Sequence, residues 1–237
     1  MTHSISYVGI IHNTAEFPYT LAANIAHWAQ VSGKFTTVKC MSYRRNIHAL
    51  LLPLVGNSTA TFHPAILAQQ MPWQHAERPK NRTKYATVFI ETTEALEYAI
   101  NRSFLDHAFM ADVRQQIELM SPTSSTGVTG DCRLLFVITD IRSEEEMAVI
   151  KTIFTSGRGM FVRAVGNKDS RASLKCAELD GSFVEQFYTR VEPARFSFMV
   201  DNTSSEADLE AINTAVLELL PDDKTKNSKT VKLEEMD

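Results

Sequence analysis

One short segment holds the residues of this 237-residue chain that are best suited to chemistry. It reads Asp140-Ile141-Arg142-Ser143, followed by three glutamates. An aspartate at the carboxyl end of a strand can hold Mg²⁺ through water or orient a phosphate acceptor, and an arginine two residues later can reach phosphate oxygens. The spacing also fits a purely structural role, in which Asp140 caps the next helix and Arg142 pairs with one of the glutamates. Spacing alone leaves both interpretations open.

Glycine motifs that bind phosphate can be checked directly, because the chain has only nine glycines. A P-loop needs G-x-x-x-x-G-K-[ST], but before the single Gly-Lys pair, Gly33-Lys34, the first glycine is replaced by Trp28. The dinucleotide pattern G-x-G-x-x-G fails at Gly157-Arg158-Gly159, where Val162 takes the place of the last glycine. The histidines and serines form no metalloprotease or hydrolase motif. Intact forms of these motifs are therefore excluded.

Composition and charge are those of an ordinary globular protein, with 44% hydrophobic and 22% charged residues. The net charge of −4 gives no overall attraction to nucleic acid or to an anionic membrane. Three cysteines without a C-x-x-C pair predict buried free thiols rather than a disulfide framework. The chain has no signal sequence and no apolar run near the ~20 residues that span a bilayer, so we expect a cytoplasmic protein.

Strands and helices alternate along the chain on either side of the Asp140 segment. Apolar runs predict strands at 5–11, 35–41, 134–138, 160–165 and 196–200, and helical periodicity predicts helices at 20–29, 45–55, 143–154 and after 205. Residues 92–120 are predicted to be helix-rich, with an inner face of Leu96, Ile100, Phe104, Ala108 or Phe109, and Ile117. The alternation predicts a doubly wound, mostly parallel α/β sheet, in which ligands bind beyond the carboxyl ends of the strands.

In this order the motifs resemble those of the bacteriophage deoxynucleoside monophosphate kinases. The stretch from Thr139 to Met147 is similar to that family's D-x-R-x-x-x-E segment, and Tyr7 to Ile10 with the following loop and helix is similar to its first strand, P-loop and first helix. The resemblance implies a P-loop nucleoside monophosphate kinase fold. It also implies an enzyme that uses Mg²⁺ to transfer the γ-phosphate of ATP to deoxynucleoside monophosphates. It also implies a place in the cytoplasm of an infected bacterial host.

The resemblance assigns roles to individual residues and segments. Asp140 and Arg142 would be catalytic, and no metal ligand is identified. The nucleotide or its phosphates would be bound by Gly9, Thr20, Arg45, Thr93, Glu94, Lys168 and Arg171. The chain would be a single domain over 1–220, with a polar excursion and helical substrate-side region at 56–120, a lid-like segment at 166–195 and a disordered tail at 221–237.

The chain departs from the family at the phosphate loop. The family pattern G-x-x-G-x-G-K-[DS]-T keeps only its first glycine, Gly9, and its last residue, Thr20, while Phe17-Pro18 stands for Gly-Lys. Proline has no N–H to donate, the lysine charge is lost, and Glu16 brings an anion toward the phosphates. We therefore expect a pseudo-kinase with weakened or lost phosphoryl transfer. If the chain retains nucleotide binding, its ligands would be a nucleotide such as ATP, together with Mg²⁺; otherwise it would have no cofactor.

Two other functions remain open. The first is an active kinase with an atypical phosphate loop, in which Lys34, Arg44, Lys168 or Arg171 replaces the missing lysine. The second is a non-enzymatic phage protein whose partner is another protein or a second copy of the chain.

Overall fold

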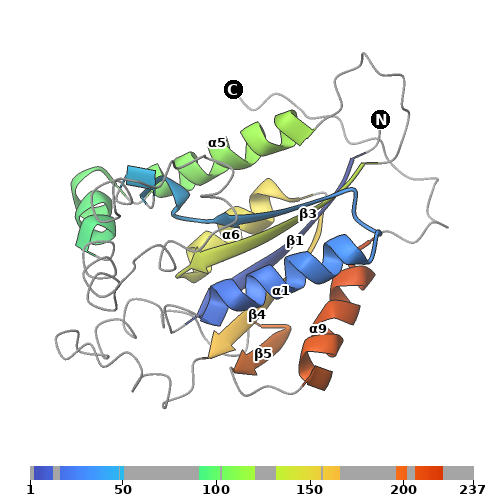
Figure 1. Ribbon diagram of the computed structural model, residues 1–237. Helices are drawn as coiled ribbons and strands as arrows, with labels where there is room; N and C mark the ends of the chain where they lie inside the picture. The colour runs from blue at the N-terminus through green and yellow to red at the C-terminus, as the bar shows by residue number, and fades with distance from the viewer. Residues whose placement is uncertain are drawn as a thin grey trace, which may run out of the picture.

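Five strands form one parallel sheet in the computed structural model of the chain (Figure 1). The strands are β1 (His3–His12), β2 (Thr37–Ser42), β3 (Cys132–Ile141), β4 (Arg158–Val165) and β5 (Phe198–Asp201). They are ordered β2-β3-β1-β4-β5 across the sheet, and every neighbouring pair is parallel. The predicted parallel α/β class is confirmed.

The structure describes nine stretches of the chain. They are residues 3–12, 17–47, 49–50, 91–101, 103–120, 132–155, 157–165, 196–201 and 206–220. The predicted lid-like segment at 166–195, the tail at 221–237 and most of the polar excursion that begins at 56 lie outside these stretches.

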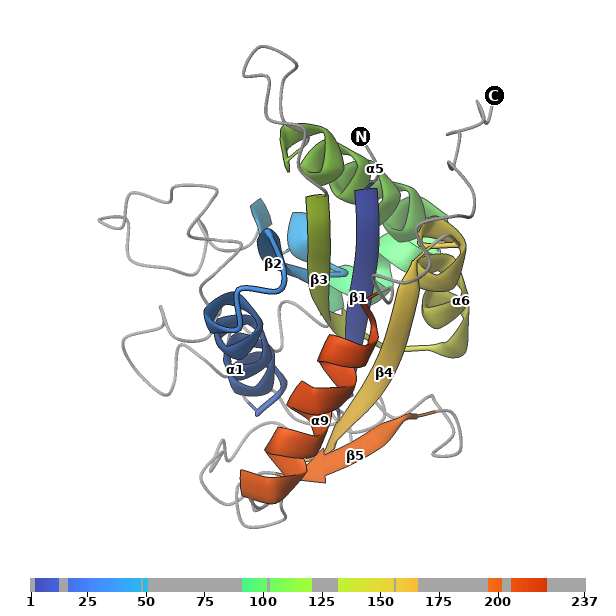
Figure 2. The ribbon, with the colours of Figure 1, turned by 90° about the vertical axis from the view of Figure 1, so that its right-hand side faces the viewer.

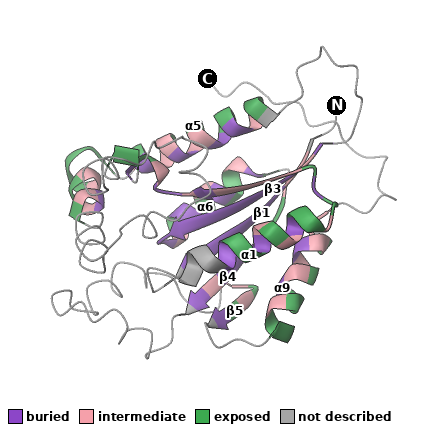
Figure 3. Ribbon diagram, viewed as in Figure 1, coloured by how far each residue is buried: buried purple, intermediate pink, exposed green. Residues whose placement is uncertain are grey.

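Helices cover both faces of the sheet (Figures 1 and 2). One face carries α1 (Phe17–Val31) and α9 (Glu206–Glu218), and the other carries α5 (Ser103–Met120) and α6 (Glu144–Ile153). Side chains of β3 alternate between the two layers, since Leu135 packs on the α1 side and Leu134 and Phe136 pack on the α5 and α6 side. Both faces of β3 are therefore buried, which explains its continuous apolar run (Figure 3).

The predicted strand-helix-strand unit is present as β3, α6 and β4. Met147, Ile150 and Phe154 form the buried stripe of α6, as the helical spacing predicts. β1 lies between the two strands of the unit, because β3 and β4 both pair with β1. This arrangement puts β3 and β1 near the centre of the sheet, and the carboxyl end of β3 is the end that leads into α6.

The inner face predicted for residues 92–120 is only partly right. Residues 91–99 are helical, but Asn101 has a φ of 117°, and α5 starts at Ser103. This break shifts the helical phase, so that Ile100 and Phe104 are exposed while Leu105 and Phe109 are buried. The prediction assumed one continuous helical phase over residues 92–120, so it could not locate the break at Asn101.

Two glycines of the sheet lie opposite aromatic rings. Gly9 pairs with Phe161 of β4, and a Cβ atom at residue 9 would lie 2.5 Å from that ring. Gly159 pairs with Tyr7 of β1, and its added Cβ would lie 2.1 Å from the Tyr7 ring. Gly9 therefore lies inside β1, and Gly159 lies inside β4.

Two of the three cysteines lie in the described stretches, and both are free thiols. Cys132 is buried and Cys40 is partly buried. Burial raises the pKa of the Cys40 thiol to about 11. Cys176 lies outside the described residues.

Candidate functional site

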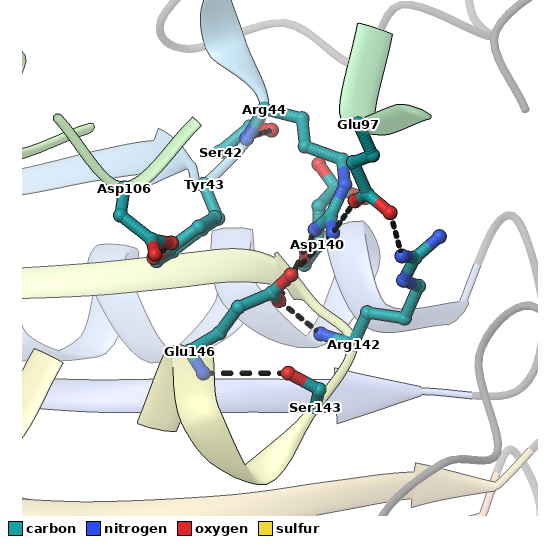
Figure 4. A network of polar contacts seen from close by, with 9 residues as sticks. All are labelled: Ser42, Tyr43, Arg44, Glu97, Asp106, Asp140, Arg142, Ser143 and Glu146. Atoms are coloured by element: carbon teal, nitrogen blue, oxygen red, sulfur yellow. Dashed lines mark hydrogen bonds and ion pairs between the residues drawn. The ribbon is translucent and has the colours of Figure 1, made fainter. Parts of the chain in front are cut away.

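Charged residues from four parts of the chain meet at the carboxyl ends of β2 and β3 (Figure 4). Arg44 follows β2, Asp140 and Arg142 lie at the end of β3, Glu146 is in α6, and Glu97 is in helix 91–99. We call these five residues the carboxyl-end network. Their position is where ligands bind in open parallel α/β sheets.

Arg44 is the centre of the network and is fully buried. Its guanidinium donates through Nη1 to the carbonyl oxygen of Asp140 and through Nη2 to Oε1 of Glu146. A second bond from Nη1 reaches Oε2 of Glu146 at 3.3 Å, which makes the pair bidentate. The chain is turned toward this site because the Arg44 N–H donates to the hydroxyl of Ser42 at 3.0 Å.

Glu146 is positioned by the start of α6. Ser143 is the N-cap of this helix, and its hydroxyl accepts from the N–H of Glu146 at 3.3 Å. Oε2 of Glu146 accepts in turn from the N–H of Arg142 at 2.6 Å. This is a variant of the capping box, in which the return bond goes to the N–H of Arg142, one residue before the N-cap. The purely structural role considered for the Asp140 segment made Asp140 the cap of this helix. That prediction was wrong, since the cap is Ser143.

Asp140 contributes its main chain to the network through an irregular backbone. The pairing of β1 with β3 changes register between Gly9 and Ile11, so that β3 has one extra residue at this point. Asp140 itself has a φ of 60°, in the left-handed region that aspartate tolerates better than most residues. The bulge accompanies a carbonyl group that accepts from Arg44, and the Asp140 side chain is completely buried.

Glu97 joins the two arginines. Its Oε2 accepts from Nη2 of Arg142, and its Oε1 lies 3.6 Å from Nη2 of Arg44. The guanidinium of Arg142 thus pairs with Glu97, and its backbone N–H donates to Glu146 of the glutamate triplet. The sequence pointed to a contact with a glutamate of the triplet, and the structure adds Glu97 as a second partner of Arg142.

The two arginines differ in how well their charges are compensated. Burial lowers the pKa of Arg44, but Glu146, Glu97 and Asp140 together hold it above its usual value. Burial and the neighbouring charge of Arg44 place the pKa of Arg142 below its usual value, although Glu97 and Glu146 oppose this effect. Arg142 is therefore the cation that depends more on an anion nearby.

Arg45 does not belong to the network. Its Nη1 lies 3.6 Å from Oδ1 of Asp112 in α5, and both side chains are partly exposed. Tyr43, which precedes Arg44 in the sequence, donates its hydroxyl to Oδ1 of Asp106 at 2.5 Å. Burial and this bond raise the pKa of Tyr43, so the hydroxyl stays protonated and acts as a donor.

The remaining predicted site residues are spread over the fold. Thr93 is buried on helix 91–99, one turn before Glu97, and Glu94 beside it is partly exposed. Thr20 is in the first turn of α1, and Gly9 is inside β1. Lys168 and Arg171 lie outside the described residues. The structure thus brings Asp140 and Arg142 together with Arg44, but it does not add Arg45 or Gly9 to them.

Lys34 cannot replace the missing P-loop lysine. It lies between the end of α1 and the start of β2. Since β2 is parallel to the central strands, this point is at the amino ends of the strands, opposite the network.

Three residues of the network were not predicted as site residues from the resemblance. Arg44 was considered only as a substitute cation, and Glu146 is the last residue of the D-x-R-x-x-x-E segment but was given no role of its own. The Ser143-x-x-Glu146 spacing is a local signal that could have identified Glu146. Glu97 is 45 residues from Arg142 in the sequence, and no local pattern marks it.

The first turn of α1 lacks the lysine and one of the N–H groups that would bind the triphosphate of Mg·ATP. α1 begins at Phe17, so Pro18 lies in its first turn, and residues 17–20 include no basic residue. Within the described stretches, no group of three histidine, cysteine or acidic side chains is arranged to hold a metal ion. Helix N-termini bind phosphate through converging N–H groups, and a proline removes one of them.

Comparison with known proteins identifies no family. No family model and no curated protein matches the sequence. Among solved structures, the chain is similar to the tunicamycin resistance protein of Deinococcus radiodurans, with 10% identity over 91% of this chain and 94% of that chain and a TM-score of 0.36. Across the described stretches, no helix has the length and apolar character needed to cross a bilayer.

Proposed function

We propose that the chain is a deoxynucleoside monophosphate kinase-like protein that has lost phosphoryl transfer from ATP and binds a nucleoside monophosphate at the carboxyl-end network. The observation that carries this proposal is the start of α1 at Phe17, which puts Pro18 in the first helical turn. In a working kinase of this type, that turn supplies N–H groups and a lysine to the phosphates.

The loss of this cradle bears directly on the chemistry. Phosphoryl transfer is catalysed almost entirely by positioning and by stabilising the charge on the transferred group. Asp140 and Arg142 cannot supply the missing function as they stand, since both are buried and Arg142 is paired with Glu97. A catalytic group must reach the reacting atoms, and these two side chains are held by the protein itself.

The part of the site that suits an acceptor phosphate is retained. Arg44 and Arg142 lie at the carboxyl ends of the strands, and guanidinium groups bind phosphate oxygens in pairs. The buried Thr93 on the adjoining helix is in the element that the resemblance assigns to nucleotide binding. These features support binding of a nucleoside monophosphate. They do not support binding of ATP.

Thermal unfolding of the purified chain tests this proposal, because a ligand of the native state raises the midpoint. We expect the midpoint to rise with the concentration of at least one deoxynucleoside monophosphate. The same nucleoside without its phosphate, and ATP with Mg²⁺, should leave the midpoint unchanged. A protein that responds to no nucleotide would be a scaffold, and a protein stabilised by ATP with Mg²⁺ would favour the active kinase.

A further inference from the structure

We propose that Glu97 is an internal anion that occupies a phosphate position between Arg44 and Arg142, so that an external phosphate group binds there by displacing it. The inference rests on the proposed function only for the nucleoside part of the ligand. Glu97 has no role in the family resemblance, and its place here follows from its contacts alone.

The contacts of Glu97 are those that a bound phosphate would make. One carboxylate oxygen accepts from Nη2 of Arg142, and the other lies 3.6 Å from Nη2 of Arg44 (Figure 4). A phosphate monoester also presents several oxygens to two guanidinium groups, with more negative charge than a carboxylate. A single group therefore bridges the two arginines in either case.

Exposure shows which member of the network an incoming anion can replace. The side chain of Glu97 is 15% exposed, whereas those of Arg44, Arg142 and Glu146 are exposed by 2% or less. Asp140 is completely buried as well. Glu97 is thus the member that faces solvent, and its departure would uncover the two guanidinium groups.

The helix that carries Glu97 is attached to the protein by a small surface. Within residues 91–99, Thr93 alone is buried, and Tyr98 is 94% exposed. Thr93 and Glu97 are four residues apart and lie on the same face of the helix. Because segments with few buried apolar contacts move at low cost, the helix can shift when an external anion takes over its contact.

Electrostatics favours an anion at this position. Glu146 remains bidentate with Arg44 if Glu97 leaves, so Arg44 keeps a close counter-charge. Glu97 is the carboxylate that pairs with the guanidinium of Arg142, which is buried close to the positive charge of Arg44. Two buried cations without their shared anion would repel each other, and phosphate would relieve that repulsion.

The test compares the Glu97→Gln variant of the full chain with the unchanged chain in thermal unfolding. Glu91→Gln is the matched control, because Glu91 is an exposed glutamate of the same helix. Inorganic phosphate is titrated against sodium chloride at equal ionic strength, so that screening is the same in both series.

In chloride, Glu97→Gln should unfold at a lower temperature than the unchanged chain and the Glu91→Gln control. Phosphate should return the midpoint of Glu97→Gln by about 3 °C or more, at a half-saturating concentration at least about tenfold below that of the unchanged chain. Adding Arg142→Ala to Glu97→Gln should abolish this recovery. A phosphate response of Glu97→Gln equal to that of the unchanged chain would overturn the inference.

A second variant keeps the test decisive if Glu97→Gln does not fold. Glu97→Asp retains the charge on a shorter side chain, so it should unfold at a temperature closer to that of the unchanged chain and respond to phosphate more strongly than the unchanged chain does. A Glu97→Asp protein with no increased response would also overturn the inference.

Phosphate and nucleotide are tested separately, so the two proposals can fail separately. Recovery of Glu97→Gln by inorganic phosphate, with no response of the unchanged chain to any deoxynucleoside monophosphate, would support the role of Glu97 and contradict the proposed function. Stabilisation of the unchanged chain by a nucleotide, with no increased phosphate response of Glu97→Gln, would support the function and contradict the role of Glu97.

Discussion

Asp140 acts in the network through its backbone as well as through its charge. Its left-handed φ of 60° and the bulge of β3 accompany a carbonyl group that accepts from the buried guanidinium of Arg44. Strained backbone of this kind persists where the surrounding contacts hold it, and it is common at functional sites. The residue at 140 must therefore tolerate the conformation and also supply a charge beside Arg44.

Replacement of Asp140 should follow backbone tolerance. Asparagine adopts the left-handed region readily, so Asp140→Asn should lower the free energy of unfolding only through the loss of the buried charge and not through backbone strain. Valine is β-branched and should cost about 1–3 kcal/mol more. Urea denaturation of the two variants measures this difference, and a Val variant as stable as the Asn variant would show that the carbonyl geometry is unimportant.

Arg44 and Arg45 are neighbours in sequence with opposite environments. Arg44 is fully buried in a bidentate pair with Glu146, whereas Arg45 is 22% exposed beside Asp112. Breaking a buried pair leaves an uncompensated charge, so Arg44→Ala should lower the free energy of unfolding by about 3–5 kcal/mol. Arg45→Ala should lower it by no more than about 1 kcal/mol.

Urea denaturation of the two alanine variants gives both values, and each is the control for the other. Equal losses in the two proteins would mean that the network contributes no more to stability than a surface ion pair.

At the scale of elements, the facing glycines and aromatic rings fix how closely β1 and β4 pack. Tyr7 stacks on Phe154 with ring centroids 5.2 Å apart, and it meets Phe161 edge to face at 5.6 Å. Gly159 leaves the space that the Tyr7 ring fills, and Gly9 does the same for Phe161. The glycines at positions 9 and 159 are therefore explained by the space that the two aromatic rings need.

Substitution of Gly159 by alanine should be destabilising, because the added methyl group would overlap the Tyr7 ring. Overpacking of this kind costs about 1–3 kcal/mol in the free energy of unfolding. The smaller side chain of Tyr7→Leu should reduce the cost of Gly159→Ala, so the double variant should be more stable than the sum of the single losses predicts. Additive losses in urea denaturation would show that the two residues do not compete for space.

Local signals predicted the elements better than they predicted the site. The apolar run of β3 and the helical periodicity of α6 each lie within fewer than a dozen adjacent residues, and both elements are confirmed. The contacts of Arg44 with Glu146 and of Glu97 with Arg142 join residues 102 and 45 positions apart. Such contacts depend on the sheet order, which no periodicity contains.

At the scale of the whole molecule, stability comes mainly from burial of apolar side chains. Two apolar layers enclose the sheet, one against α1 and α9 and one against α5 and α6. Hydrophobic burial of this kind dominates the stability of a fold. The strand order and the carboxyl-end network are therefore compatible with the loss of the phosphate loop that we propose.

The most direct test of the proposed loss of phosphoryl transfer from ATP is a single-turnover assay. The purified chain, at a concentration above that of the nucleotide, is mixed with Mg²⁺, γ-labelled ATP and each of the four deoxynucleoside monophosphates in turn. We predict no labelled deoxynucleoside diphosphate above that of a mixture without protein, since the first turn of α1 contains Pro18 and no lysine. Labelled diphosphate that increases with protein concentration, and that disappears in an Arg142→Ala variant, would contradict the proposal.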